Sequence, residues 1–161
     1  MNPCPCGYYG DTKKHCCCSA AQLQRYNSRI SGPLLDRFDL HVEVARPKGK
    51  HLVEQSSEES SAEVSARVRQ ARNKQQARQR KLNRDLKAEQ LQANENIGSK
   101  ELAWLGKAMD KLTLSPRAFH RVLKVARTIA DMSDEPRIQK NHLQEALLYR
   151  PKPTTQSMPI S

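Results

Sequence analysis

Five cysteines lie within the first eighteen residues of the chain, at positions 4, 6, 16, 17 and 18. Such a cluster is not typical of a disulfide framework and indicates metal or redox chemistry in a reducing compartment. Cys4 with Cys6 and Cys16 with Cys18 form two C-x-C pairs, and four thiolates are what tetrahedral zinc requires. These four cysteines are therefore predicted to bind one metal ion, with a loop of reduced cysteines as the alternative.

Two arginines are placed where they could contact another molecule. Arg117 follows Ser115-Pro116, a helix cap and a proline at the first helical position. The helix macrodipole disfavours a cation at this end of the helix and favours an anion. A bound phosphate would therefore offset the unfavourable interaction between the Arg117 charge and the macrodipole. Arg37 precedes a predicted strand, where an arginine can reach a neighbouring molecule. The alternatives are a solvated surface arginine and a local surface pair between Asp36 and Arg37.

A strongly basic segment lies in the middle of the chain. Between residues 65 and 87 there are nine basic residues and one acidic residue. The segment contains no glycine or proline and favours a helix over residues 62–91. Gln75 and Arg78 interrupt its apolar stripe, so its middle is not expected to be deeply buried. The predicted nucleic-acid contacts are Arg78, Arg80, Lys81 and Arg84, and the alternative is a solvated charged helix.

The remaining pattern is mainly helical. Short helices are expected over residues 20–30 and 34–38, and alternation of polar and apolar residues predicts a strand over residues 39–44. No other segment offers that strand a partner. Apolar ladders and caps predict further helices over residues 99–112, 115–130 and 139–149.

Composition limits the classes of partner and compartment. The chain has 161 residues with a formal net charge of +11, 37% hydrophobic residues and 4% aromatic residues. Its mean hydropathy is -0.82 and its isoelectric point is near 9.7, which favours a polyanionic partner. No run approaches the roughly 18 apolar residues of a membrane span. No membrane partner is expected, and the expected location is the cytoplasm.

Three sequence runs carry a family resemblance: MNPCPCG at residues 1–7, ISGPLLDRFDL at residues 30–40, and LSPRAFHRVLKVARTIAD at residues 114–131. Together they resemble the C-terminal part of the magnesium-chelatase-like AAA+ ATPases of the ComM/YifB type. The resemblance spans roughly residues 1–150. It implies that Asn2 is the sensor-1 asparagine, Arg37 the arginine finger that reaches the next subunit's nucleotide, and Arg117 the sensor-2 arginine of a helical lid.

The resemblance also implies a fold and a domain order. We expect a mostly α chain, a helical bundle like an AAA+ lid with a short remnant of an α/β AAA+ core. The expected parts are that remnant with its cysteine loop (1–46), a linker (47–61), the basic helix (62–95), the lid (96–150) and a disordered tail (151–161).

The implied function of the intact relative is ATP-driven remodelling of DNA by a ring homo-oligomer, as in a branch-migrating helicase. A metal-insertion motor of the magnesium chelatase type is an alternative. This sequence contains neither a G-x-x-x-x-G-K-[ST] loop nor an acidic Walker-B strand, the parts that hold ATP and magnesium. We therefore expect a portion of such a protein that is inactive alone. The rivals are a small basic nucleic-acid-binding module and a non-functional product of a truncated gene.

Overall fold

The computed structural model describes residues 1–161 except 12, 45–58, 94 and 151–161. It divides the chain into two compact units, Met1–Phe38 and Asp39–Ser161. The predicted disordered tail and most of the predicted linker lie outside the described residues. No helix in the described part of the chain combines the length and apolar character needed to cross a membrane.

The first unit has two short helices and almost no apolar core. Helix α1 (Ala20–Asn27) begins at Ser19, whose side chain accepts from the Gln22 N–H in a capping box, and α2 (Gly32–Leu35) begins with a proline in its first turn. Among the described residues of this unit, only Cys4 is buried. Hydrophobic burial therefore contributes little to the order of this unit.

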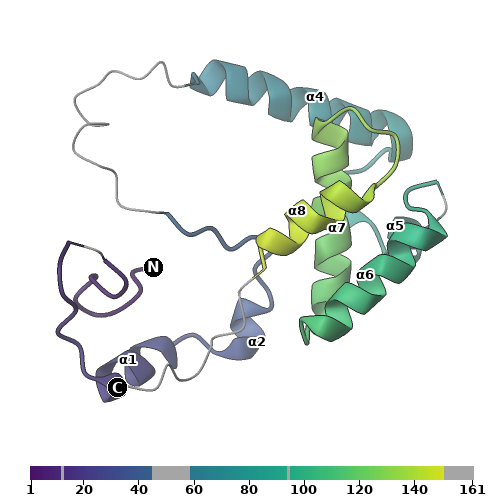
Figure 1. The fold of residues 1–161 in the computed structure, drawn as a ribbon. Coiled ribbons are helices and arrows are strands. Elements are labelled where there is room, and N and C mark those ends of the chain that lie inside the picture. The colour runs from purple at the N-terminus through teal and green to yellow at the C-terminus, as the bar shows by residue number, and fades with distance from the viewer. Residues whose placement is uncertain (12, 45–58, 94, 151–161) are drawn as a thin grey trace. The chain divides into compact units, whose positions relative to one another are not determined.

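The second unit is a bundle of helices arranged around α7 (Figure 1). It contains α4 (Ser61–Gln79), the 3-10 turn η1 (Asn83–Asp85), α5 (Ala88–Gln92), α6 (Ser99–Lys111), α7 (Pro116–Met132) and α8 (Lys140–Leu148). Helix α7 packs against α4, η1, α5 and α8, and α6 packs against α8. The predicted mostly helical fold is thus confirmed.

The core of this bundle forms from the apolar ladders that the sequence predicts. Leu105 of α6, Val122 and Leu123 of α7 and Leu143 of α8 are fully buried. Helix α7 begins at the predicted Ser115-Pro116 cap, where the Ser115 hydroxyl accepts from the Ala118 N–H. Burying an aliphatic side chain of this size contributes about 1.5–3 kcal/mol.

The predicted strand over residues 39–44 is wrong. These residues are not part of a strand, and Leu40, Val42 and Val44 are 53%, 67% and 89% exposed. A β-strand is stabilised by a ladder of bonds to a neighbouring strand, and the described residues contain no such neighbour. A backbone hydrogen bond joins this segment to the end of α8: the His41 N–H donates to the Tyr149 carbonyl at 2.8 Å.

The predicted long basic helix is divided into three pieces. Helix α4 ends at Gln79, because Arg80 adopts the left-handed conformation with φ 53°. The chain then passes through η1 and the short helix α5, which places Leu86 and Leu91 in the apolar core. If the helix continued past Gln79, the chain could not turn back toward α7 at Arg80, and Leu86 and Leu91 would not reach the core.

One face of the middle of α4 is buried, at Ala71 and Gln75, and the burial of Gln75 is contrary to the sequence-based expectation. Gln75 is only 5% exposed, and its side-chain oxygen accepts from the Asn83 N–H at 3.0 Å. The Arg78 side chain is 29% exposed and forms an ion pair with Asp131 of α7. Of the two polar residues that interrupt the apolar stripe, Gln75 is buried through a specific hydrogen bond, which removes most of the cost of burial. Arg78 stays at the surface, where Asp131 holds its guanidinium.

Candidate functional site

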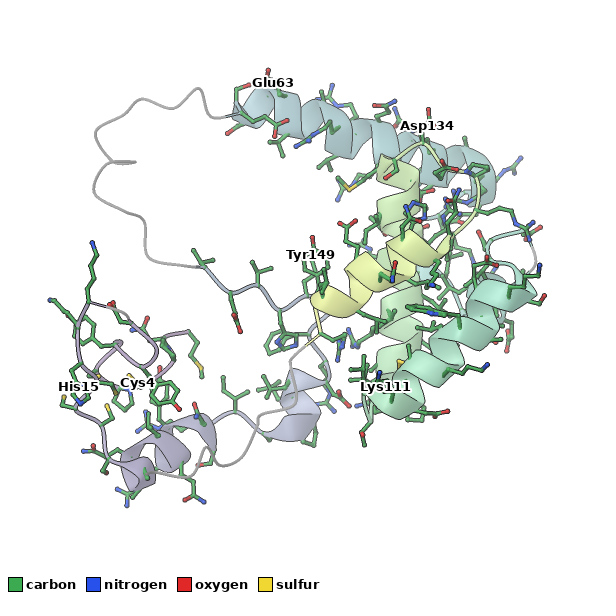
Figure 2. The ribbon with its side chains drawn as sticks, viewed as in Figure 1. Cys4, His15, Glu63, Lys111, Asp134 and Tyr149 are labelled. Atoms are coloured by element: carbon green, nitrogen blue, oxygen red, sulfur yellow. The ribbon has the colours of Figure 1, made fainter. Side chains whose placement is uncertain are left out.

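The four predicted metal ligands lie together in the first unit. The sulfur atoms of Cys4, Cys6, Cys16 and Cys18 are all within 4.8 Å of one another. The Sγ atoms of Cys4 and Cys6 are 3.3 Å apart, those of Cys6 and Cys16 are 3.5 Å apart, and those of Cys16 and Cys4 are 3.7 Å apart. Residues ten or more positions apart in the chain thus meet at one point, near the labelled Cys4 in Figure 2.

A tight turn brings the first two sulfurs together. The Gly7 N–H donates to the Cys4 carbonyl at 3.1 Å, and the Tyr9 N–H donates to Cys4 Sγ at 3.3 Å. Gly7 has φ +82°, a backbone conformation that residues other than glycine rarely adopt. The backbone therefore supports the sulfurs in the way that outer hydrogen bonds orient metal ligands.

The sulfur spacing fits tetrahedral coordination. Zinc–sulfur bonds of about 2.3 Å place the sulfurs of a tetrahedral site about 3.8 Å apart. The three separations among the sulfurs of Cys4, Cys6 and Cys16 fall within 0.5 Å of that value, and the Cys18 sulfur lies within 4.8 Å of the other three. Cys17 lies outside the group and is exposed. The donor type, number and spacing therefore match a closed four-thiolate site.

The electrostatics of the cluster favour one thiolate even without a metal. A hydrogen bond from the backbone of Tyr8, and then one with Cys4, lower the pKa of Cys6 from 9.0 to about 6. The backbone of Cys6 lowers the pKa of Cys18, but desolvation and the neighbouring sulfurs outweigh this and raise it to about 12. A divalent cation would replace the remaining protons, since metal ligands bind as thiolates.

Arg117 lies in the first turn of α7 and is exposed. In the described part of the chain it forms no ion pair. The next basic residues on the same face are engaged: Arg121 pairs with Asp39, and Lys124 donates to the Arg84 carbonyl at 2.5 Å. Arg117 is thus available for an external anion at a helix N-terminus.

The two other predicted nucleotide contacts belong to the first unit. Asn2 is exposed, and its side-chain amide lies 3.7 Å from the point where a Cβ on Gly7 would be. Arg37 is exposed and follows α2, with its N–H donating to the Leu34 carbonyl. Both side chains lie at the surface of their unit, where they can meet another part of a larger assembly.

The predicted nucleic-acid contacts differ in their surroundings. Arg78 is held by Asp131, as described above, whereas Arg80 and Arg84 are exposed. The Lys81 ammonium donates to the Gln90 side chain at 3.0 Å. On α4 itself, Arg67 pairs with Glu59 and Lys74 pairs with Asp134. Much of the basic charge of α4 is therefore neutralised by nearby acids.

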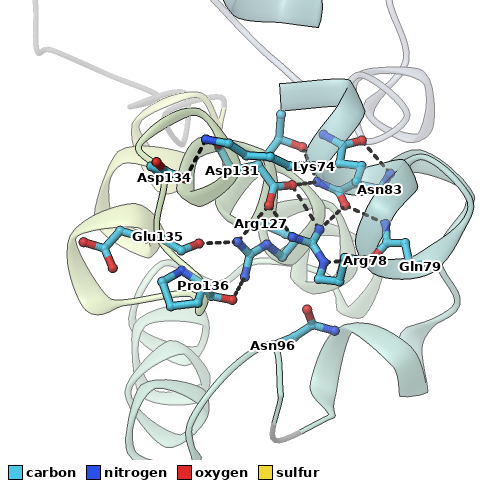
Figure 3. A network of polar contacts seen from close by, with 12 residues as sticks. Lys74, Arg78, Gln79, Asn83, Asn96, Arg127, Asp131, Asp134, Glu135 and Pro136 are labelled. Atoms are coloured by element: carbon cyan, nitrogen blue, oxygen red, sulfur yellow. Dashed lines mark hydrogen bonds and ion pairs between the residues drawn. The ribbon is translucent and has the colours of Figure 1, made fainter. Parts of the chain in front are cut away.

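Sequence reasoning missed a buried polar network centred on Asp131 (Figure 3). The Asp131 carboxylate accepts from the Arg78 guanidinium at 2.5 and 3.1 Å, from Arg127 at 2.9 Å, and from the Asn83 amide at 2.8 Å. Arg127 and Asp131 have side chains 0% and 1% exposed. Burial raises the pKa of Asp131, but the hydrogen bonds from Arg78 and Asn83 and the nearby positive charges outweigh it and lower the pKa overall.

The network fixes α4 and η1 against α7. Its only sequence signal is an Arg127/Asp131 pair at the i, i+4 spacing on an otherwise apolar face. Removing one member would leave a buried charge without compensation. We interpret the arrangement as structural, because the Asp131 side chain is only 1% exposed.

Comparison with known proteins identifies the class of protein. Residues 58–150 match the family described as magnesium chelatase, subunit ChlI C-terminal, and residues 1–52 match the family described as magnesium chelatase, subunit ChlI. The chain belongs to the magnesium chelatase family.

Individual relatives narrow the comparison to the ComM/YifB type. The chain is 44% identical to the competence protein ComM of Haemophilus influenzae over 151 residues. The aligned region covers 93% of this chain and 29% of that protein. The chain has the same identity and coverage with the uncharacterised protein YifB of Escherichia coli. An uncharacterised protein of Mycobacterium tuberculosis is 32% identical to this chain over 153 residues, and the aligned region covers 92% of this chain and 30% of that protein. The chain therefore spans less than a third of the length of these curated relatives.

Proposed function

We propose that this chain supplies the arginine-finger and lid portion of an ATP-hydrolysing AAA+ machine. The observation that carries the proposal is Arg117, exposed and without an ion pair in the described part of the chain, in the capped first turn of the central lid helix. A guanidinium beside the positive end of a helix forms a good phosphate contact. The family match supports the assignment of Arg117 as sensor 2.

Two further residues have proposed roles in the same reaction. Asn2 acts as sensor 1, donating its side-chain amide toward the attacking water or the terminal phosphate. Arg37 acts as the finger that stabilises transition-state charge in the nucleotide site of the next subunit, an effect worth about 10³–10⁵ in rate in related chemistry. Such a finger in trans requires a ring of identical subunits with head-to-tail contacts.

Bound ATP with magnesium supplies the phosphoanhydride that is hydrolysed. This chain's residues contact its terminal phosphate but do not cradle the other phosphates or hold the metal, since the sequence lacks the glycine-rich loop and the Walker-B acid. Hydrolysis therefore needs a polypeptide portion with those motifs.

We infer that the substrate of the machine is DNA, remodelled as by a branch-migrating helicase in the cytoplasm. The net charge of +11 supports a polyanionic substrate rather than a metal-insertion partner. One relative is named a competence protein. The alternative is a motor of the magnesium chelatase type, which would act on a metal-inserting partner instead.

We also propose that Cys4, Cys6, Cys16 and Cys18 bind one structural zinc ion. The four sulfurs are already close enough to share one ion, and their unit has almost no apolar core to order it otherwise. Zinc would supply the cross-link that fixes this loop.

A chimera tests the nucleotide proposal. The part of Haemophilus influenzae ComM that aligns with this chain is replaced by this chain, and ATP turnover is measured with and without DNA. Arg117→Ala should lower turnover at least about tenfold, because it removes a charged contact to the reacting phosphate. Lys107→Gln, an exposed change on α6, should leave it unchanged. Equal turnover in the Arg117→Ala and Lys107→Gln chimeras would reject the sensor-2 role.

A second candidate function is nucleic-acid binding without nucleotide chemistry. It is favoured by the exposed Arg69, Arg72, Arg80 and Arg84 on and after α4. Salt-dependent binding by the chain, with no response of the chimera to ATP, would favour this second function.

A further inference from the structure

An aromatic and basic surface lies beside the four-cysteine cluster. Tyr9 is 57% exposed, and Lys13, Lys14 and His15 are exposed on the loop between the two cysteine pairs. Tyr8, Tyr9, Lys14 and His15 line an open cleft of about 300 Å³ whose inner wall includes Cys16 and Cys18. The labelled His15 and Cys4 show this part of the first unit in Figure 2.

The backbone at the two lysines is held in place, and the Lys14 side chain lies against Tyr8. The Asp11 carboxylate accepts from the Lys13 N–H at 2.7 Å and the Lys14 N–H at 3.1 Å. The Lys14 ammonium lies 4.9 Å from the centre of the Tyr8 ring and 3.3 Å from its hydroxyl. Asp11 thus serves the backbone of the loop, and no carboxylate is paired with either lysine side chain in the described part of the chain.

The charge of the first unit favours the same kind of partner. This unit contains five basic residues and two acidic residues. The basic residues are Lys13, Lys14, Arg25, Arg29 and Arg37, and the acidic residues are Asp11 and Asp36. A solvent-exposed aromatic ring beside lysines is the combination that binds single strands, because bases stack on the ring and the cations follow the phosphates. A duplex keeps its bases stacked inside and cannot use the ring.

We propose that Tyr9, Lys13 and Lys14 form a contact surface for single-stranded nucleic acid, with the base stacked on Tyr9 and the backbone along the two lysines. The proposal rests on the proposed function in one respect: the polyanion is the nucleic acid on which the machine is proposed to act. Its residues are different from those proposed as phosphate contacts on and after α4 and from Asn2, Arg37 and Arg117.

The test uses the full chain purified with zinc and a fluorescent single-stranded oligothymidylate, measured by anisotropy at several salt concentrations. Tyr9→Leu should weaken binding roughly 5- to 150-fold, the usual effect of losing one stacked base. Phe38→Leu is the matched control, since Phe38 is also an exposed ring of this unit but does not line the cleft. Zinc content is measured in every variant, which separates loss of the surface from loss of the metal site.

The lysines are tested through the salt dependence. Lys13→Gln with Lys14→Gln should lower the slope of log K against log salt by about 1.4, since about 0.7 counterions are released per single-strand phosphate contact. The matched control, Lys107→Gln with Lys111→Gln on α6, should leave the slope unchanged.

Three results would overturn the proposal. They are equal affinity of the Tyr9→Leu and Phe38→Leu variants at full zinc content, a preference for duplex over single strand, and an unchanged slope in the lysine variant. A chain that binds oligothymidylate as predicted but contains no zinc would contradict the metal proposal and leave this surface supported.

Discussion

Single residues in the first unit determine whether it is ordered. The four clustered cysteines take the place of an apolar core, and the N–H groups of Gly7 and Tyr9 support Cys4. The pKa of Cys6, about 6, makes that sulfur a thiolate at neutral pH, whereas the pKa of Cys18, about 12, keeps that thiol protonated until a metal replaces the proton. Most of the binding energy of a metal would then appear as folding energy of this unit.

Zinc content is the first prediction at this scale. Chain purified without chelator should contain about one equivalent of zinc, as expected for a closed four-ligand site. Cys6→Ser should lower the content below about 0.2 equivalents, because three thiolates leave the site open. Cys17→Ser is the matched control and should keep the full amount, since Cys17 lies outside the cluster. Elemental analysis showing equal, low metal in all three proteins would count against the site.

At the scale of elements, the α4–α7 contact depends on polar residues. The buried Asp131 carboxylate joins Arg78 of α4, Asn83 of η1 and Arg127 of α7. The helix that the sequence predicts to be solvated is therefore part of the folded bundle.

We predict that Asp131→Asn destabilises the chain by about 3 kcal/mol, because it leaves the buried Arg127 without its counter-charge. Arg72→Gln, an exposed change on α4, should alter stability by less than about 0.5 kcal/mol. Urea unfolding followed by circular dichroism measures both. Similar midpoints for the two variants would show that the network contributes little.

The same carboxylate makes stability depend on pH. Its folded pKa is below the unfolded value, which is near 3.9, so its contribution is complete above that pH. The contribution is lost as pH falls through the folded pKa. The gap in stability between wild type and Asp131→Asn should therefore narrow below about pH 4. A gap that is constant down to pH 2 would contradict this assignment.

The basic residues after α4 test the second candidate function. Replacing Arg80, Lys81 and Arg84 by Gln, with Arg78 kept because it holds Asp131, should weaken nonspecific DNA binding and lower its salt slope by about 2.7 for duplex DNA. The nonspecific dissociation constant of the wild type should be on the order of 10⁻⁴ to 10⁻⁶ M. Filter binding or anisotropy across salt concentrations measures this. An unchanged slope in the triple variant would reject these residues as phosphate contacts.

How much of these elements the sequence predicts depends on the range of the interactions. Local signals predict the start of α7, because Ser115 and Pro116 act within one turn. They also predict which four cysteines meet. The burial of Gln75 and the ion pair of Arg78 could not be predicted, because they depend on Asn83 and on Asp131, which lies 53 residues beyond Arg78. The expected strand was wrong because a strand requires a neighbour that local alternation does not reveal.

At the scale of the whole molecule, the two units are stabilised by different means. Burial of apolar side chains stabilises the second unit, whereas the first is proposed to depend on a metal. The chain belongs to the magnesium chelatase family, and its exposed Asn2, Arg37 and Arg117 are proposed to act only with the remaining parts of an ATP site.

Hydrogen exchange should separate the two units. Amides of Val122, Leu123 and Ala126 in α7 should be strongly protected, and those of Leu40 and Val44 should exchange fast, because the latter lack a partner strand. Adding a chelator should remove protection at Gly7 and Tyr9 and leave α7 unchanged. If chelation also exposed α7, the metal would stabilise both units together.

Subunit mixing in the ComM chimera tests the central claim most directly. The isolated chain should not hydrolyse ATP. A chimera with Arg37→Ala lacks the finger and should lose activity by a factor of about 10³ or more. A second chimera, in which the Walker-A lysine is replaced, keeps the finger but should also be inactive because it cannot hold the phosphates. Mixed in equal amounts, they should recover about a quarter of the wild-type rate, because one in four head-to-tail contacts then joins an intact finger to an intact phosphate loop. Full activity of the Arg37→Ala chimera, or no recovery on mixing, would contradict the account.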